Sequence, residues 1–191
     1  MRFKIVGILR YFGILSILSS WITIITSILL NPWFKFAKNA FSDLGASNAC
    51  MPWIFNYGLM ITGVLIILYS FAQFLDSMNI LEYLGSGYTN VMGIFLMLIG
   101  LYPTGTYPHT FVSVWFFIQG DLAIAVWGLG LIIRRWYRLG LSYITLALIS
   151  PIIAYIIKWP SIATLEVFGI LVLDIWIITL FKIHLRGNLI R

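Results

Sequence analysis

Charged side chains are scarce in this sequence of 191 residues, of which 9% are charged and 61% are hydrophobic. An average soluble domain carries roughly 25% charged residues, so this chain has too few to cover the surface of a water-soluble globule. Intrinsic disorder is excluded as well, because disordered chains combine low hydrophobicity with high charge. The scarcity predicts a protein that resides in a membrane.

Cysteine and histidine are scarce too, since the chain has only Cys50, His109 and His184. A single cysteine forms neither an internal disulfide nor a cysteine-rich metal site. The two histidines fall on opposite sides of the membrane in the topology given below, so they share neither a zinc ion nor a haem. A glycine-rich phosphate loop is absent, and the basic residues flank apolar runs instead of forming a nucleic-acid patch. We therefore expect no metal, no cofactor and no nucleic-acid partner.

Long apolar runs are what the sequence has in abundance. A membrane-spanning helix needs about 20 apolar residues, and six segments meet that length. They cover approximately residues 9–31, 53–74, 84–102, 110–133, 140–158 and 162–181. Backbone groups in lipid must be satisfied within the segment, so continuous runs of this length predict helices and not the short alternating strands of a barrel. The expected fold is all-α: one integral membrane domain over residues 1–191, with six helices in an antiparallel bundle.

The basic residues predict the orientation of this bundle. One side carries Arg2, Lys4, Arg10, Arg134, Arg135, Arg138, Lys182, Arg186 and Arg191, and the other carries Lys35, Lys38 and Lys158. Because Lys and Arg concentrate on the cytoplasmic side, we expect a multi-pass protein of the cytoplasmic membrane with both termini inside. Residues 32–52 then form an outer loop at the interface, with room for a short amphipathic piece over 33–41.

Polar side chains gather first at the predicted outer rim. Asp43 lies in the outer loop, His109 opens the fourth segment, Lys158 ends the fifth, and Glu166 lies about one turn inside the sixth. Because the link between the last two segments is short, Glu166 is expected to reach Lys158 as an ion pair. The rim is either a set of helix caps with this salt bridge or a polar pocket open to the outside.

A second group of polar side chains lies deeper in the membrane. Asp121 is about 18 Å below the outer surface at 1.5 Å per residue, and Asp174 and Asn90 reach a similar depth. An unpaired ionised carboxylate there is costly, so each acid is expected to face a partner or to stay protonated. A facing pair of carboxyls that share a proton is one solution. This layer is either a set of interhelical hydrogen bonds or the polar floor of a site for a proton, a cation or a lipid or quinone headgroup.

Three motifs carry a resemblance to a known family. They are SDLGAS at 42–47, PWIFNYGLMITG at 52–63 and GLYPTGTYPH at 100–109. The sequence resembles the six-span prokaryotic membrane proteins grouped as domain-of-unknown-function family 998, which is distantly similar to the DRAM and Sfk-type membrane proteins of eukaryotes. The matching positions are Ser42, Asp43, Gly45, Asn56, Pro103 and His109. The resemblance implies no activity, but it implies that the outer loop and the entrance of the fourth span form one site.

Three functions are compatible with these features. The favoured one is non-enzymatic: an accessory or scaffold subunit of a membrane complex, or a lipid-contacting module, whose partners are membrane lipids, other membrane subunits or further copies of itself. The second is a transporter or binder of a lipid, quinone or other small amphiphile. Its candidate ligand-binding residues are Asn56, Asn90, His109, Asp121, Lys158, Glu166 and Asp174. The third is a membrane-embedded hydrolase that uses Ser42, Asp43 and His109, although no nucleophile-elbow spacing supports it.

Overall fold

The computed structural model is all-α throughout the residues that it describes, 2–187, with side chains described for residues 6–183. The helices are α1 Arg2–Leu30, α2 Pro52–Asp76, α3 Ile80–Leu101, α4 His109–Ile133, α5 Tyr137–Ile156 and α6 Ile162–Gly187, with the 3₁₀ helix η1 Phe41–Gly45 between α1 and α2. All six long helices are apolar enough to cross a membrane, and their bounds lie within a few residues of the predicted segments except at the ends of α1 and α6. The predicted six-helix membrane bundle is therefore confirmed.

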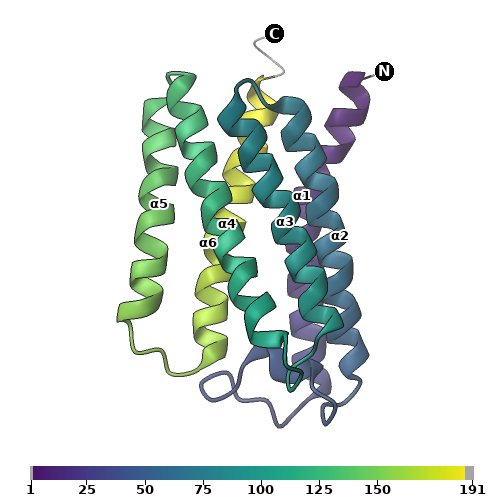
Figure 1. The fold of residues 1–191 in the computed structure, drawn as a ribbon. Coiled ribbons are helices and arrows are strands. Elements are labelled where there is room, and N and C mark those ends of the chain that lie inside the picture. Colours follow the sequence, from purple (N-terminus) through teal and green to yellow (C-terminus); the bar gives the residue numbers. More distant parts are fainter. Residues whose placement is uncertain (1, 188–191) are drawn as a thin grey trace.

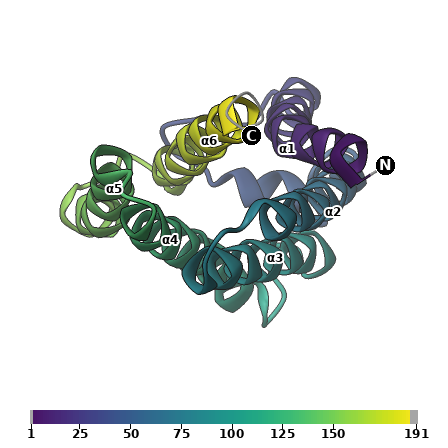
Figure 2. The same ribbon diagram turned by 90° about the horizontal axis from the view of Figure 1, so that it is seen from above.

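The long helices alternate in direction and form a ring in chain order (Figures 1 and 2). Each helix from α1 to α5 packs against its successor, and α6 closes the ring between α5 and α1. One end of the bundle carries both termini, and we refer to it as the terminal end (Figure 1). The opposite end carries the three links 31–51, 102–108 and 157–161. We refer to it as the loop end.

The sequence predicts that the terminal end faces the cytoplasm, and this orientation stays a prediction. Among the residues on which it rests, Arg191 lies outside the described residues. The side chains of Arg2, Lys4 and Arg186 lie outside the described side chains, as does that of His184.

Three large aromatic side chains are buried inside the ring toward the terminal end. Trp127 of α4, Trp176 of α6 and Tyr69 of α2 are completely buried there. A ring carbon of Tyr69 lies so near Gly13 of α1 that a methyl group at Gly13 would approach it to 2.9 Å. These large aromatic side chains close the interior of the bundle between its middle and its terminal end.

Two ion pairs tie neighbouring helices together at the same end. The guanidinium of Arg10 donates to both carboxylate oxygens of Asp76, at 2.7 Å and 2.6 Å, and joins α1 to α2. Arg134, just after α4, lies 3.5 Å from the buried carboxylate of Glu82 in α3. Glu82 also accepts the backbone N–H of Met78 at 2.7 Å and so fixes the link between α2 and α3. The terminal end is thus held by charge as well as by packing.

The loop 31–51 turns inward beneath the ring at the opposite end (Figure 2). The predicted amphipathic piece over 33–41 is wrong, because this stretch forms turns and the helical residues are Phe41–Gly45. The carboxylate of Asp43 accepts the N–H of Ala40 at 2.9 Å, which favours a 3₁₀ turn at this point. Phe41 and Leu44 are buried against the bundle core. The loop therefore acts as the floor of the ring at the loop end.

Candidate ligand-binding groove

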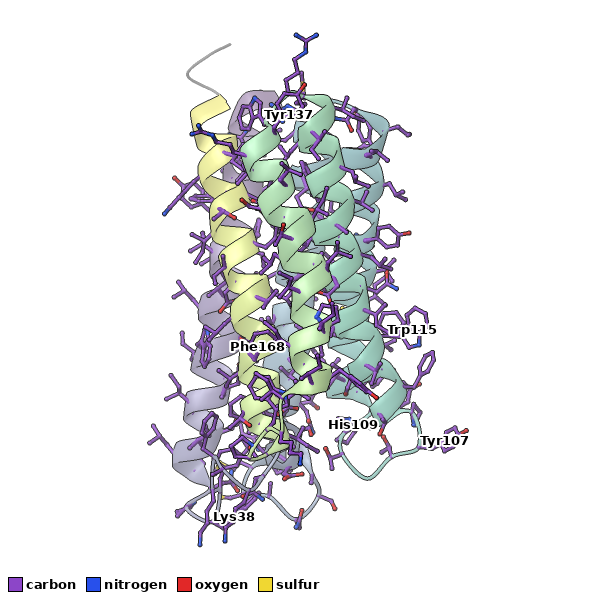
Figure 3. The ribbon with its side chains drawn as sticks, turned by 90° about the vertical axis from the view of Figure 1, so that its left-hand side faces the viewer. Lys38, Tyr107, His109, Trp115, Tyr137 and Phe168 are labelled. Carbon is purple, nitrogen blue, oxygen red and sulfur yellow. The ribbon has the colours of Figure 1, made fainter. Side chains whose placement is uncertain are left out.

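A groove of about 530 Å³ lies between α4, α5 and α6 toward the loop end. Its walls are largely apolar and include Val114, Phe117, Ala154, Leu165, Phe168 and Val172. Tyr155 and Ile162 also line it, and these residues are 90% and 61% exposed. The groove therefore opens between the end of α5 and the start of α6, on a surface that faces lipid in a membrane. Figure 3 looks onto this side of the bundle, with Phe168 and His109 labelled.

A smaller cavity of about 90 Å³ lies next to the groove, in the middle of the ring. Ser42, Phe117, Glu166 and Leu173 line both spaces. The ring of Phe117 packs on the backbone of α6 at Gly169, where an added methyl group would lie 2.5 Å from a ring carbon. The interior of the loop-end half is thus hollow, and the Phe117 side chain borders both parts of the hollow.

The deep polar level of the groove is formed by Asp121 of α4 and Ser150 of α5. The Ser150 hydroxyl donates to the Asp121 carboxylate at 3.1 Å. Pro151 follows in the middle of α5 and lines the same groove. This level presents acceptor oxygens within an apolar wall.

The other two residues predicted at this depth face different helices. The Trp21 indole N–H of α1 donates to Asp174 at 2.8 Å, and Asp174 lines the central cavity. The Asn90 amide donates to the Ser70 hydroxyl of α2 at 2.9 Å. In place of a facing pair of carboxyls, the structure gives Asp121 and Asp174 separate donors. The sequence indicates how deep a residue lies, but these side chains point in different directions around their helix axes.

The rim level of the groove is built around Glu166 of α6. Its carboxylate accepts the backbone N–H of Phe41 at 2.7 Å, so it anchors the loop 31–51 beneath α6. The predicted ion pair with Lys158 is wrong, because Lys158 is exposed and the ion pairs among the described residues are Arg10–Asp76 and Arg134–Glu82. The N–H at the start of η1 is the partner that the fold brings to Glu166. Ser42 and Ser113 line the groove beside it.

His109 lies at the mouth of the groove, at the start of α4. Its Nδ1 is 2.8 Å from the carbonyl oxygen of Tyr102, so Nδ1 must carry a proton. Its Nε2 lies 3.2 Å from the hydroxyl of Thr104. Asp43 instead accepts N–H groups of its own loop, from Ala40 at 2.9 Å and Asn39 at 3.4 Å. The hydrogen bonds of the predicted hydrolase residues therefore stay within separate loops.

Asn56 holds the outer loop in place. Its amide donates to the carbonyl of Gly45 at 3.0 Å, which ties α2 to the end of η1. A side chain at Gly45 would collide with the Asn56 amide, so glycine is needed at this close approach. Ser42 from the loop and His109 from α4 both line the groove. Asn56 itself lines neither the groove nor the cavity, and its amide holds the loop.

Sequence reasoning missed Ser113, Ser150 and Pro151 as groove residues, although a signal for the first is visible. His109, Ser113, Phe117 and Asp121 follow one another at intervals of four residues, which places them along one face of a helix. No comparable pattern marks Ser150, because its role depends on the rotation of α5 against α4.

Comparisons with known proteins give a family but no relative. The family model described as "Protein of unknown function (DUF998)" matches residues 14–182 of the chain. No curated protein and no solved structure matches the chain. Within the described residues, no group of three or more His, Cys, Asp or Glu side chains is arranged to hold a metal ion.

Proposed function

The chain belongs to the DUF998 family of membrane proteins, and we propose that it binds a membrane-borne amphiphile in the groove between α4, α5 and α6. The observation that carries the proposal is the groove itself: an apolar hollow that opens toward lipid and has polar groups at two levels. Membership of the family identifies no ligand, so the proposal rests on the geometry of this chain.

The dimensions of the groove support a small-molecule ligand. Ligand pockets typically measure about 300–1,000 Å³ and combine apolar walls with a few convergent polar groups. The groove, at about 530 Å³, falls in this range, and its polar groups include Asp121, Ser150 and Glu166. Apolar walls suit a hydrocarbon tail, whereas these oxygens suit a hydrogen-bonding end.

The route into the groove supports a ligand that arrives from the bilayer. Tyr155 and Ile162 border the opening and are largely exposed. At the other end, Trp127, Trp176 and Tyr69 fill the interior of the ring. A ligand would therefore enter from the side, between α5 and α6, and the buried aromatic side chains of the terminal half oppose a continuous passage. This arrangement favours a binding protein over an open channel.

The two other functions predicted from the sequence find less support. An accessory or scaffold role remains a proposal that agrees with the apolar outer surface, but it leaves the groove unexplained. A hydrolase would need His109 to activate a nucleophile, whereas both ring nitrogens of His109 already contact Tyr102 and Thr104. Binding without chemistry is therefore the function that the geometry supports best.

Photolabelling tests the proposal directly. The protein is reconstituted in nanodiscs with hexadecanol that carries a diazirine in its tail, and the labelled residues are identified by mass spectrometry. We expect adducts on the groove residues of α4, α5 and α6. An Ala154→Phe variant fills the groove from α5 and should lose most of this labelling.

An Ile152→Phe variant is the matched control. It places the same ring on α5 two residues away, at an exposed position that does not line the groove. Groove labelling should persist in this variant. Adducts spread evenly over the lipid-facing helices, at a level that Ala154→Phe leaves unchanged, would contradict the proposal.

A further inference from the structure

We propose that the ligand of the groove is an amphiphile whose polar end donates hydrogen bonds, through hydroxyl or amine groups, and carries no phosphate. This inference rests on the proposed function and specifies the class of ligand. It follows from the kind of polar atoms that line the groove and from the position of the basic residues outside it.

The groove and the adjoining cavity offer no basic side chain to an anion. Among the side chains that the structure describes, no lysine or arginine lines either space. The imidazole of His109 lines the groove, but the Tyr102 carbonyl and the Thr104 hydroxyl already contact its two ring nitrogens. A phosphate buried here would lose its hydration without gaining an opposite charge, which is strongly unfavourable in an apolar site. The electrostatics of the groove therefore select against anionic headgroups.

Acceptor oxygens dominate the rim level. A carboxylate has about four acceptor sites on its two oxygens. In Glu166, the N–H of Phe41 uses one of them, on Oε2. Ser42 and Ser113 line the same groove, and a serine hydroxyl can accept as well as donate a hydrogen bond. A hydroxyl or amine of the ligand would supply donors for the remaining acceptor sites of Glu166.

The deep level repeats the same chemistry. Asp121 lines the groove and receives one hydroxyl hydrogen bond, from Ser150, so its carboxylate has further acceptor sites. With a carboxylate at each level, a ligand with several hydroxyl groups, or with an amine, gains charge-assisted hydrogen bonds wherever its polar end settles. A polar end that only accepts, such as an ester, gains hydrogen bonds only from the hydroxyls of the wall.

The basic residues at the loop end lie outside the groove. Lys35, Lys38 and Lys158 are exposed, and none of them lines either space. An anionic lipid that met these lysines would bind at the rim surface and not in the groove. The two modes of binding therefore make opposite demands on the headgroup, and an experiment can separate them.

Competition between amphiphiles with the same tail tests this inference. Hexadecylglycerol ether, hexadecylamine, hexadecyl phosphate and methyl hexadecanoate are each added to the hexadecanol photolabelling described above. We expect the glycerol ether and the amine to halve groove labelling at concentrations about tenfold below those required for the phosphate and the ester, since one charge-assisted or well-formed hydrogen bond is worth about that factor. Comparison of the glycerol ether with the amine shows whether the groove recognises hydroxyl groups or an amine.

Charge at the two levels is tested with Glu166→Gln and Asp121→Asn. Glutamine keeps an acceptor oxygen for the Phe41 N–H, so Glu166→Gln removes charge while the loop bond is retained. In at least one of the two variants, we expect the amine concentration that halves groove labelling to rise about tenfold. The corresponding concentration of the glycerol ether should change much less. Lys158→Met is the control, and it should leave both compounds unaffected. The comparison of the four compounds on the unaltered protein needs no variant at all.

The outcomes separate the two proposals. If the photoprobe labels the groove and the phosphate or the ester competes as well as the amine, the headgroup inference is overturned and the binding function stands. The headgroup inference is also overturned, and the binding function stands, if hexadecyl phosphate competes and Lys158→Met abolishes this competition. The phosphate headgroup would then bind at the rim while its tail occupies the groove. If the photoprobe does not label the groove, the proposed function fails and the inference fails with it.

Discussion

The two halves of this bundle are built from the same helices but have different interiors. Toward the terminal end, Trp127 and Trp176 are completely buried, and the ion pair Arg10–Asp76 links α1 to α2. Toward the loop end, the interior holds the groove of about 530 Å³ and the smaller cavity beside it. There the acids face into open space, with a hydroxyl or an N–H as partner, as Asp121 and Glu166 do.

This difference separates stability from binding. In the terminal half, each acid is paired with an arginine across a helix contact, which fixes the position of neighbouring helices. In the loop-end half, Glu166 and Asp121, the two acids that line the groove, each meet a single neutral donor, which leaves further acceptor sites on both carboxyls. We infer that the terminal half holds the fold and that the loop-end half holds the ligand. Variants in the two halves should therefore differ in which property they change.

The largest effect on stability is expected for Asp76→Asn. The side chains of Arg10 and Asp76 are only 5% and 10% exposed, so the variant removes the charge that faces a buried guanidinium. Breaking a buried ion pair in this way costs about 3–5 kcal/mol. The cost is measured by equilibrium unfolding in detergent. The same substitution at Asp43, in the loop 31–51, is the control; it should cost below about 1 kcal/mol, since asparagine also caps a helical turn. Equal costs at the two positions would contradict the comparison.

Truncation of one aromatic side chain in each half sharpens the comparison. Trp127→Ala should cost about 3–5 kcal/mol, because it leaves a sealed void in a packed interior. Phe117 already borders the groove and the central cavity, so Phe117→Ala merely joins two spaces and should cost less than this range. Phe117→Ala should instead increase groove labelling by bulkier amphiphiles. A Phe117→Ala variant that unfolds as readily as Trp127→Ala would show that the loop-end half is not the looser one.

A smaller effect is expected at the contact that holds the outer loop. Gly45→Ala places a methyl group against the Asn56 amide and 2.9 Å from a ring carbon of Phe55. Overpacking of this kind costs about 1–3 kcal/mol. Adding Asn56→Ala should recover part of the loss, because it removes one of the two clashing groups. The double variant is compared with both single variants by thermal unfolding. If the double variant loses the sum of the two single losses, the clash is not the cause.

The smallest effect is expected for Lys158→Met. Lys158 is exposed and forms neither of the described ion pairs, so its loss should leave the melting temperature unchanged within error. Glu166→Ala removes the acceptor of the Phe41 N–H and should lower the melting temperature measurably. Equal losses from the two variants would indicate that Glu166 and Lys158 pair in the membrane after all.

The architecture was predictable because lipid imposes simple rules on sequence. Continuous apolar runs identify all six spanning helices, and short links make consecutive helices antiparallel neighbours. The loop 31–51 was identified as the exceptional link from its length, but length alone did not locate the helical turn at Phe41–Gly45. The hydrogen bond that Asp43 accepts from the Ala40 N–H favours the turn at this point.

The site was predictable in depth but not in direction. Asp121 and Asp174 do lie well inside the spans, yet one faces α5 and the other faces α1. Hydropathy does not encode the rotation of a helix about its axis, so the partners could not be assigned. Arg10 and Arg134 were treated only as signals of orientation. Their pairing with Asp76 and Glu82 follows once consecutive antiparallel helices are aligned end to end.

A cryo-electron microscopy map of the protein in lipid nanodiscs tests the central claim most directly. We expect elongated density in the groove between α4, α5 and α6, with its polar end within hydrogen-bonding distance of Glu166 or Asp121 and its tail against Phe117. We also expect solid side-chain density around Trp127 and Trp176. A groove closed by contact between α5 and α6, or density that lies only on the outer surface, would contradict the assignment of the loop-end half to ligand binding.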